Sequence, residues 1–130
     1  MSIGLLIITH NQIGQALLDA ALGMIGEQPL QTRTVAVTAS SNPEQTTAEA
    51  RKLLEELDQG EGVLILTDMF GSTPSNIAAS LLDRPHIMVV TGINLPMLIR
   101  VLNYSHLGLA ELAQKATSGG HDGIIWSSSR

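Results

Sequence analysis

The sequence predicts an α/β fold in which a mainly parallel, open sheet carries helices on both faces. Short, continuous apolar runs, typical of strands buried on both sides, alternate with longer segments that show helical apolar spacing. Several helical segments begin at a capping residue followed by proline, and the first two end near glycine. The chain has 130 residues, 44% of them hydrophobic, which is enough for one domain over residues 1–130 with a sizeable core.

The first predicted strand is the apolar run Ile3–Ile8, which is followed by Thr9 and His10. A helix comes next, and its apolar positions fall on one face: Ile13, Ala16, Leu17, Ala20, Ala21 and Met24. This helix should close near Gly26. The short, β-branched segment Thr34–Val37 is the second predicted strand.

The second helix has the clearest start signal in the chain. Asn42 is its predicted N-cap, Pro43 occupies the first helical position and Gln45 completes a capping-box pattern. The helix should run to about Gly60. The third buried strand is Gly62–Thr67.

For the third helix we predict Thr73 as the N-cap and Pro74 at the first position. Its apolar face comprises Ile77, Ala78, Leu81 and Leu82. The fourth strand is Ile87–Val90, and Asn94 should cap the helix that follows it.

The end of the chain is predicted to hold one more helix and one more strand. The helix carries Leu109, Leu112, Ala113 and Ala116, and Gly119–Gly120 should end it. The strand is the apolar run Ile124–Trp126. Because this strand follows a long excursion, we expect it at an edge of the sheet, where it can pair with another subunit.

Composition excludes several classes of function. The chain contains no cysteine, so it has no disulfide, thiolate nucleophile or zinc–thiolate site. A net charge of -5 and 2% aromatic residues argue against binding of nucleic acid. The first apolar run is too short to cross a bilayer and lacks a basic segment before it. We therefore expect a cytoplasmic protein.

Polar groups follow three of the predicted strands: His10 after the first, Asp68 after the third, and Thr91–Gly92 with Asn94 after the fourth. In open α/β sheets the functional crevice lies outside the carboxyl ends of the strands. If the first and third strands are neighbours, Asp68 can bond one ring nitrogen of His10 and leave the other as a nucleophile. The alternative is a histidine that merely ends a strand and bonds a loop.

The segment Gly71-Ser72-Thr73-Pro74 directly follows the Asp68 loop. Glycine permits close approach of the backbone, and a helix start with hydroxyl donors favours an anion. Gly71, Ser72 and Thr73 are therefore candidate phosphate-binding residues. An ordinary capped helix would explain the same segment without a ligand.

Other sites have weaker support. Ser72, His10 and Asp68 could make a hydrolase triad, but no G-x-S-x-G motif is present. A metal site at His10 and Asp68 would be two ligands short, because the other histidines lie elsewhere. Nucleotide-binding glycine motifs are missing. We expect neither a metal nor a cofactor.

Three motifs resemble the mannose-type enzyme IIA domain of the bacterial sugar phosphotransferase system, in the mannose/fructose/sorbose family. They are Ile8-Thr9-His10, the segment Thr67–Asn76 with its sequence TDMFGSTPSN, and the segment Thr91–Leu98 with its sequence TGINLPML. They occur in the family's order and are spread over nearly the whole chain.

The resemblance implies a phosphocarrier. The histidine matching His10 accepts a phosphoryl group on its tele nitrogen from the carrier HPr and passes it to a IIB component, while the residue matching Asp68 orients the ring. It also implies a parallel four-stranded sheet of order 2-1-3-4 and a homodimer whose subunits exchange a fifth, antiparallel strand. Contact with the membrane would be indirect, through IIC and IID permease subunits.

The resemblance leaves the biological role open in one respect. Many sugar-transporting members carry a IIB domain after an Ala/Pro-rich linker, whereas this sequence stops at Arg130. A stand-alone transport subunit and a regulatory phospho-switch read by a partner protein both fit. The sugar itself is not indicated, because IIA domains do not contact it.

Overall fold

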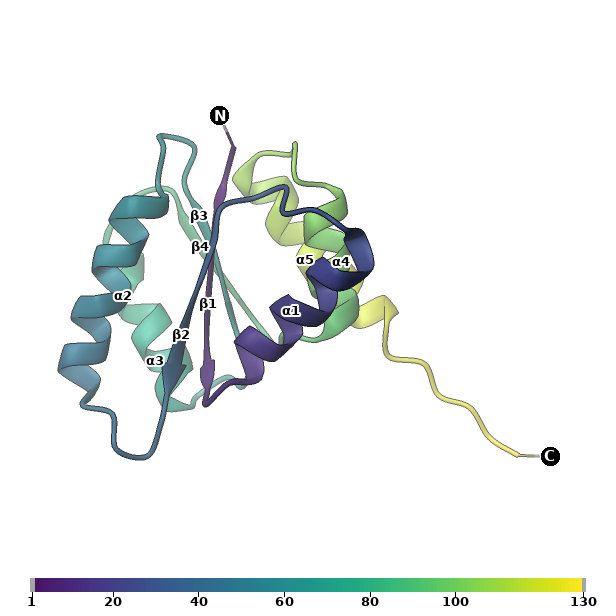
Figure 1. Cartoon of the computed structure of the whole chain (residues 1–130), viewed down its shortest axis with the longest axis horizontal. Helices are drawn as coiled ribbons and strands as arrows, with labels where there is room; N and C mark the ends of the chain where they lie inside the picture. The colour runs from purple at the N-terminus through teal and green to yellow at the C-terminus, as the bar shows by residue number, and fades with distance from the viewer. Residues whose placement is uncertain (1, 130) are drawn as a thin grey trace.

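Four parallel strands form the centre of the molecule (Figure 1). The computed structural model describes residues 2–129. Its strands are β1 (Gly4–His10), β2 (Thr32–Val37), β3 (Val63–Thr67) and β4 (Ile87–Thr91), arranged in the order β2-β1-β3-β4. The predicted fold class and strand order are confirmed.

Helices cover both faces of this sheet (Figure 1). The helices are α1 (Ile13–Ile25), α2 (Pro43–Leu57), α3 (Thr73–Ser80), α4 (Leu95–Asn103) and α5 (Leu109–Asp122), and a short 3-10 turn, η1 (Leu81–Asp83), follows α3. α2 and α3 lie on one face, while α1, α4 and α5 lie on the other. Within residues 2–129, no helix combines the length and apolar composition needed to cross a bilayer.

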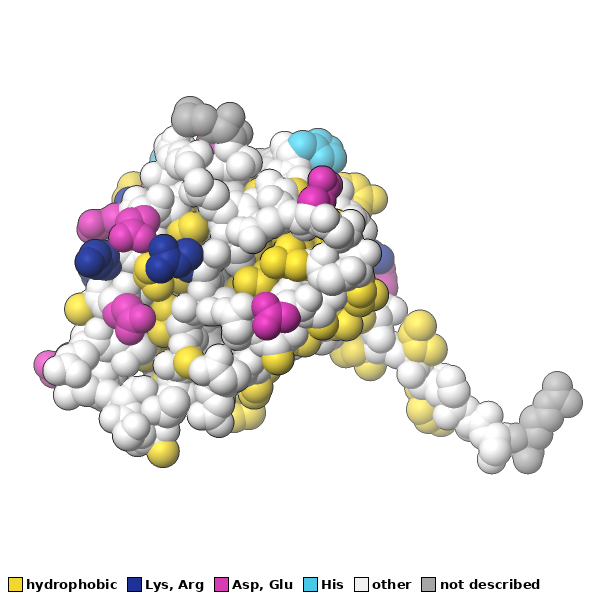
Figure 2. Space-filling view, in the orientation of Figure 1, with side chains coloured by type: hydrophobic (Ala, Val, Ile, Leu, Met, Phe, Trp, Pro, Cys, Tyr) yellow, Lys and Arg dark blue, Asp and Glu magenta, His cyan; other side chains and the backbone are white. Residues whose placement is uncertain are grey.

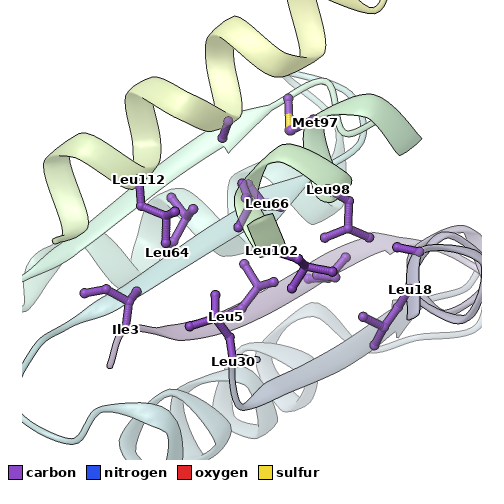
Figure 3. Packing of buried hydrophobic residues seen from close by; sticks show 14 residues of the cluster. Ile3, Leu5, Leu18, Leu30, Leu64, Leu66, Met97, Leu98, Leu102 and Leu112 are labelled. Carbon is purple, nitrogen blue, oxygen red and sulfur yellow. The ribbon is translucent and has the colours of Figure 1, made fainter. Parts of the chain in front are cut away.

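The central strands explain why the sequence shows unbroken apolar runs. Leu5 and Leu66 pack toward α1, α4 and α5 (Figure 3), whereas Leu6 and Ile65 face α2 and α3. These four side chains are completely buried. Each contributes about 1.5–3 kcal/mol relative to an exposed side chain, so the core fixes which strands lie in the middle.

The strand register brings the carboxyl ends of all four strands to one edge. Ile8 lies beside Thr67, and Thr67 lies beside Thr91. His10 and Asp68, which follow Ile8 and Thr67 closely, therefore emerge at the same place. The core thus positions the two candidate residues before any contact between them is considered.

Two predicted helix caps are confirmed at the same edge of the sheet. The Asn42 side chain accepts hydrogen bonds from the Glu44 and Gln45 backbone N–H groups, at 2.9 and 3.1 Å. The Asn94 side chain accepts one from the Met97 N–H at 2.9 Å. These contacts fix where α2 and α4 begin.

The predicted apolar face of α1 is wrong by part of a turn. The helix buries Gly14, Leu18 and Ala21, whereas Ile13 and Met24 are 45% and 67% exposed. Gly14 causes the difference, because its N–H donates to Thr9 Oγ1 and a Cβ there would lie 2.7 Å from Ile7 Cγ2. Figure 2 shows hydrophobic side chains gathered over α1.

The prediction that Gly119–Gly120 ends the last helix is also wrong, since α5 continues to Asp122. Both glycines face α4 at close range. A Cβ at Gly119 would lie 2.7 Å from the Cβ of Arg100, and one at Gly120 would lie 2.8 Å from Met97 Cε. These glycines therefore allow close contact between α4 and α5 and do not end the helix.

The predicted last strand does not form in the single chain, and its pairing with another subunit stays a prediction. Ile124, Ile125 and Trp126 form no strand, and they are 76%, 81% and 91% exposed. The segment extends away from the body of the molecule and carries hydrophobic side chains into solvent (Figures 1 and 2). A strand needs hydrogen-bonding partners, and this segment has none from a sheet in its own chain.

Candidate functional site

His10 ends β1 beside Asp68, as expected from the positions of their strands. The His10 ring nitrogen Nδ1 lies 2.8 Å from Asp68 Oδ2, and the backbone N–H of His10 donates to the same oxygen at 2.9 Å. The His10 side chain is 40% exposed and that of Asp68 is 13% exposed. The ring is therefore held on one side and open to solvent on the other.

The carboxylate of Asp68 is stabilised as an anion. Burial raises its pKa, but the hydrogen bonds from the backbone N–H and the ring of His10 outweigh burial, so the pKa lies below its ordinary value. Its second oxygen, Oδ1, accepts the Met69 N–H at 3.0 Å. An ionised Asp68 favours the tautomer with the proton on Nδ1, which leaves a lone pair on Nε2.

The turn after His10 is bonded to the end of the neighbouring strand β2. Asn11 has a positive φ of 49°, a conformation that asparagine tolerates better than most residues. Its backbone N–H donates to the Val37 carbonyl at 2.9 Å, which ties the turn to β2. The histidine thus sits between two strands that both restrain it.

A cavity of about 400 Å³ opens beside His10 at the carboxyl edge. It is lined by His10, Asn11, Val37, Thr38, Ala39, Ser41, Pro43 and Thr73. In the described part of the chain, the lining includes hydroxyl groups but no Lys or Arg. The pocket is suited to a small ligand recognised by neutral donors.

The three candidate phosphate-binding residues occupy different places. Thr73 lines the cavity beside His10. The Ser72 hydroxyl instead donates to the Met69 carbonyl at 2.5 Å. Gly71 takes a positive φ of 83°, and its N–H donates to Ser75 Oγ at 3.3 Å. Gly71 and Ser72 therefore shape the turn, while Thr73 faces the site.

The start of α3 differs from the prediction. Its N-cap is Ser72, and Thr73 is the first helical residue. No side chain caps α3, in contrast to α2 and α4. Pro74 has no N–H group and the Asn76 N–H donates to the Ser72 carbonyl, so the N–H groups of Thr73 and Ser75 are those that no capping side chain uses and that an anion could accept.

The structure gives no support to a hydrolase triad, nor to a place for Gly92 and Asn94 beside the cavity. The Ser72 hydroxyl points to a carbonyl of its own loop, so it is not arranged as a nucleophile activated by His10. Gly92 and Asn94 also lie apart from the cavity. The N–H of Gly92 closes the end of β3 by bonding the Thr67 carbonyl, and Asn94 caps α4.

Sequence reasoning missed the residues contributed by the second strand end. Thr38 and Ser41 follow β2 and line the cavity, as does Asn11 after β1. The sequence does carry a signal, because polar residues follow the second strand as they follow the other three. That signal is weak, since the loop carries no ionisable side chain.

A parallel α/β sheet with a histidine–aspartate pair at its carboxyl edge and a cavity beside it is the arrangement expected of a protein that uses an imidazole in its chemistry. The family described as "PTS system fructose IIA component" matches residues 4–117. The chain belongs to this family.

Individual relatives agree. The chain is 31% identical over 127 residues to the "PTS system mannose-specific EIIAB component" of Escherichia coli (strain K12), covering 95% of this chain and 39% of that protein. It is 41% identical over 61 residues to the "PTS system fructose-specific EIIA component" of Bacillus subtilis (strain 168), covering 45% and 42% of the two chains. The matched segment thus covers less than half the length of each of these two curated relatives.

A solved structure gives the same result. The "Mannose/sorbose specific IIA subunit of phosphotransferase system from Enterococcus faecalis" superposes with a TM-score of 0.87 at 26% identity, covering 100% of this chain and 98% of that one. Fold and family are thus supported by two independent kinds of comparison.

Proposed function

We propose that the chain is a phosphocarrier of a sugar transport system. His10 accepts a phosphoryl group from phosphorylated HPr and passes it to a IIB component. The observation that carries this proposal is the 2.8 Å contact between His10 Nδ1 and Asp68 Oδ2 at the mouth of a cavity. Family membership supports the reaction class.

The transfer requires only the two imidazoles and the phosphoryl group. Nε2 of His10 attacks phosphorus in line, its bond to phosphorus forms as the donor's N–P bond breaks, and the electron pair returns to the donor nitrogen. The Nδ1 proton stays between His10 and Asp68. The carboxylate offsets the positive charge that develops on the ring. The step to IIB repeats this sequence with His10 as the donor.

The phosphoryl oxygens need hydrogen-bond donors while the group resides on His10. Thr73 offers a hydroxyl, and the uncapped start of α3 offers N–H groups with a favourable helix dipole. Gly71 and Ser72 contribute by shaping the turn that presents these donors. We assign phosphate binding to this segment on that basis.

We also propose a homodimer assembled through the open side of β4. Within residues 2–129, β4 has a neighbouring strand on one side only. A groove of about 870 Å³ runs between β4 and α5 and is lined by apolar side chains such as Leu82 and Val89. Residues 124–126 of a second subunit would fit as an antiparallel strand along β4, completing its hydrogen bonds.

The cellular setting follows from the same proposal. The chain would act in the cytoplasm, where HPr supplies the phosphoryl group. It would reach the membrane only through the IIC and IID subunits of its permease.

The decisive experiment is to map the phosphate. Incubation with phosphorylated HPr should place one acid-labile phosphate on His10, and the His10→Ala variant should take up none. A His106→Ala variant serves as the matched control and should label like the wild type. Label on His86, His106 or His121 that persists in His10→Ala would contradict the proposal.

A further inference from the structure

The loop between β2 and α2 lies across the cavity from the start of α3. Val37 is the register partner of His10, so the loop that follows Val37 leaves the sheet beside the histidine. Thr38 and Ser41 both line the cavity, which Thr73 lines as well. Hydroxyl groups therefore approach the space next to His10 from two separate elements.

We propose that Thr38 and Ser41 form a second wall of the phosphoryl site and donate hydrogen bonds to the phosphoryl group on His10. This inference rests on the proposed function, since it assigns further positioning residues to the same phosphorylated state. No bond is made or broken at these residues. Their hydroxyl groups reorient from one another toward the phosphoryl oxygens.

The hydrogen bonds of the unphosphorylated loop leave a donor available. Thr38 Oγ1 contacts Ser40 Oγ at 3.1 Å and Ser41 Oγ at 3.2 Å, and each contact uses one hydroxyl proton. Three hydroxyl groups carry three protons. One of the three protons, on Thr38, Ser40 or Ser41 according to how the hydroxyl groups are oriented, thus has no acceptor among residues 2–129. Ser41 Oγ also accepts the Thr38 N–H at 2.9 Å, which holds the loop in place.

The first turn of α2 cannot take over this role. Pro43, the first residue of α2, has no N–H group. The next two N–H groups of the helix, those of Glu44 and Gln45, already donate to the Asn42 side chain. The start of α2 therefore offers no free N–H group here, whereas the hydroxyl groups of Thr38 and Ser41 line the cavity.

The hydroxyl groups matter because a phosphoryl group is highly charged and needs several hydrogen-bond donors. A phosphoryl group carries nearly two negative charges and three strong acceptor oxygens. In the described lining, no Lys or Arg faces it. Donors from α3 alone approach from one side, so oxygens directed toward β2 need partners from the opposite wall. Thr38 and Ser41 line the cavity on that side.

The experiment compares three variants that are phosphorylated with phosphoramidate, a small donor that needs no protein docking. Thr38→Val removes the hydroxyl and keeps the side-chain shape, Thr38→Ser keeps the hydroxyl, and Ser40→Ala is the control in the same loop but outside the cavity lining. Phosphorus NMR follows the phosphorylated fraction and its hydrolysis. We expect the ratio of phosphorylated to free protein to fall about tenfold in Thr38→Val and to stay within about twofold in the other two variants.

The outcomes separate this inference from the function on which it rests. A wild-type chain that neither phosphoramidate nor HPr phosphorylates on His10 would overturn both. If the wild type is phosphorylated and Thr38→Val behaves in the same way, only the second wall is overturned. Equal losses in Thr38→Val and Thr38→Ser would also overturn it, since shape and not the hydroxyl would then matter.

A second measurement holds even if Thr38→Val fails to fold. Amide NMR of the wild type should show shifts at Thr38 and Ser41 on phosphorylation, with sizes like those at Thr73. Unchanged resonances at Thr38 and Ser41 beside shifted ones at Thr73 would contradict the proposal.

Discussion

The edge of the sheet near His10 and the outer side of β4 differ in how far one chain completes them. At the first, Asp68 is held by the backbone and ring of His10 and by the N–H of Met69. At the second, Met88 is 37% exposed and Leu82 is 50% exposed. The apolar segment 124–126 meanwhile extends into solvent.

The comparison indicates that the proposed phosphoryl site and the proposed dimer interface lie in separate parts of the molecule. The histidine–aspartate pair and its cavity come from the ends of β1, β2 and β3, the loops that follow them and the starts of α2 and α3, so a single chain contains the whole proposed site. In the proposed homodimer, a second chain would bury the open side of β4 and the exposed segment. Changes at one region should therefore leave the other intact.

The largest effect is expected from Asp68→Asn. An amide can still contact the ring but cannot offset its positive charge, so transfer from phosphorylated HPr should slow by about tenfold to ten-thousandfold. Rapid-quench kinetics measure this rate. Sedimentation of the same variant should match the wild type. Transfer at the wild-type rate would mean that Asp68 has only a structural role after the end of β3.

Removal of the exposed apolar segment tests the other region. A chain cut after Gly123 should be monomeric or insoluble in sedimentation, because β4 would lose its partner strand. Where soluble, it should still be labelled on His10 by phosphoramidate, within about twofold of the wild type. A chain cut after Trp126, which loses only the serine-rich end, is the control and should stay dimeric. A soluble dimer after the first cut would place the interface elsewhere.

Single truncations of apolar side chains should sharpen the same contrast. Leu66→Ala opens a cavity in the core and should lower the free energy of unfolding by about 2–5 kcal/mol at any protein concentration. Ile125→Ala should lower stability only at concentrations where the wild type is dimeric. Urea unfolding at two concentrations distinguishes these cases. A concentration-independent loss in Ile125→Ala would mean that this residue packs within its own chain.

The smallest effect concerns pH. Because folding lowers the pKa of Asp68, its bonds with His10 add stability that is fully present above the ordinary carboxyl range, about pH 4, and is lost as pH falls through the folded-state pKa. The stability difference between wild type and Asp68→Asn should therefore shrink below about pH 4. Urea unfolding from neutral to acid pH measures it. A constant difference across that range would contradict the assignment.

The sequence is informative at several places where a strong local rule applies, although the capping rule predicts the N-cap of α3 one residue too late, at Thr73 instead of Ser72. The run before His10 can only be buried on both sides, and a polar residue at its carboxyl end belongs at the functional edge of such a sheet. Asp68 follows from the same rule. Asn42 and Asn94 were found because capping depends on a few adjacent residues.

The sequence was uninformative where a distant contact decides. Gly14 sets the buried face of α1 through its approach to β1, and Gly119 and Gly120 extend α5 by packing on α4. Nothing adjacent to these glycines distinguishes such a role from a helix break. Thr38 and Ser41 gain meaning only once β2 is known to lie beside β1.

One oxygen, Oδ2 of Asp68, contacts both the backbone N–H and the ring of His10. Because its ring and its backbone are both bonded to this oxygen, the His10 side chain has lost most of its torsional freedom before any partner binds. That loss of rotamer entropy is incurred when the chain folds, so it does not recur at each encounter with a donor. If the chain is the phosphocarrier proposed above, it would present its nitrogen in one orientation to both the donor and the acceptor protein.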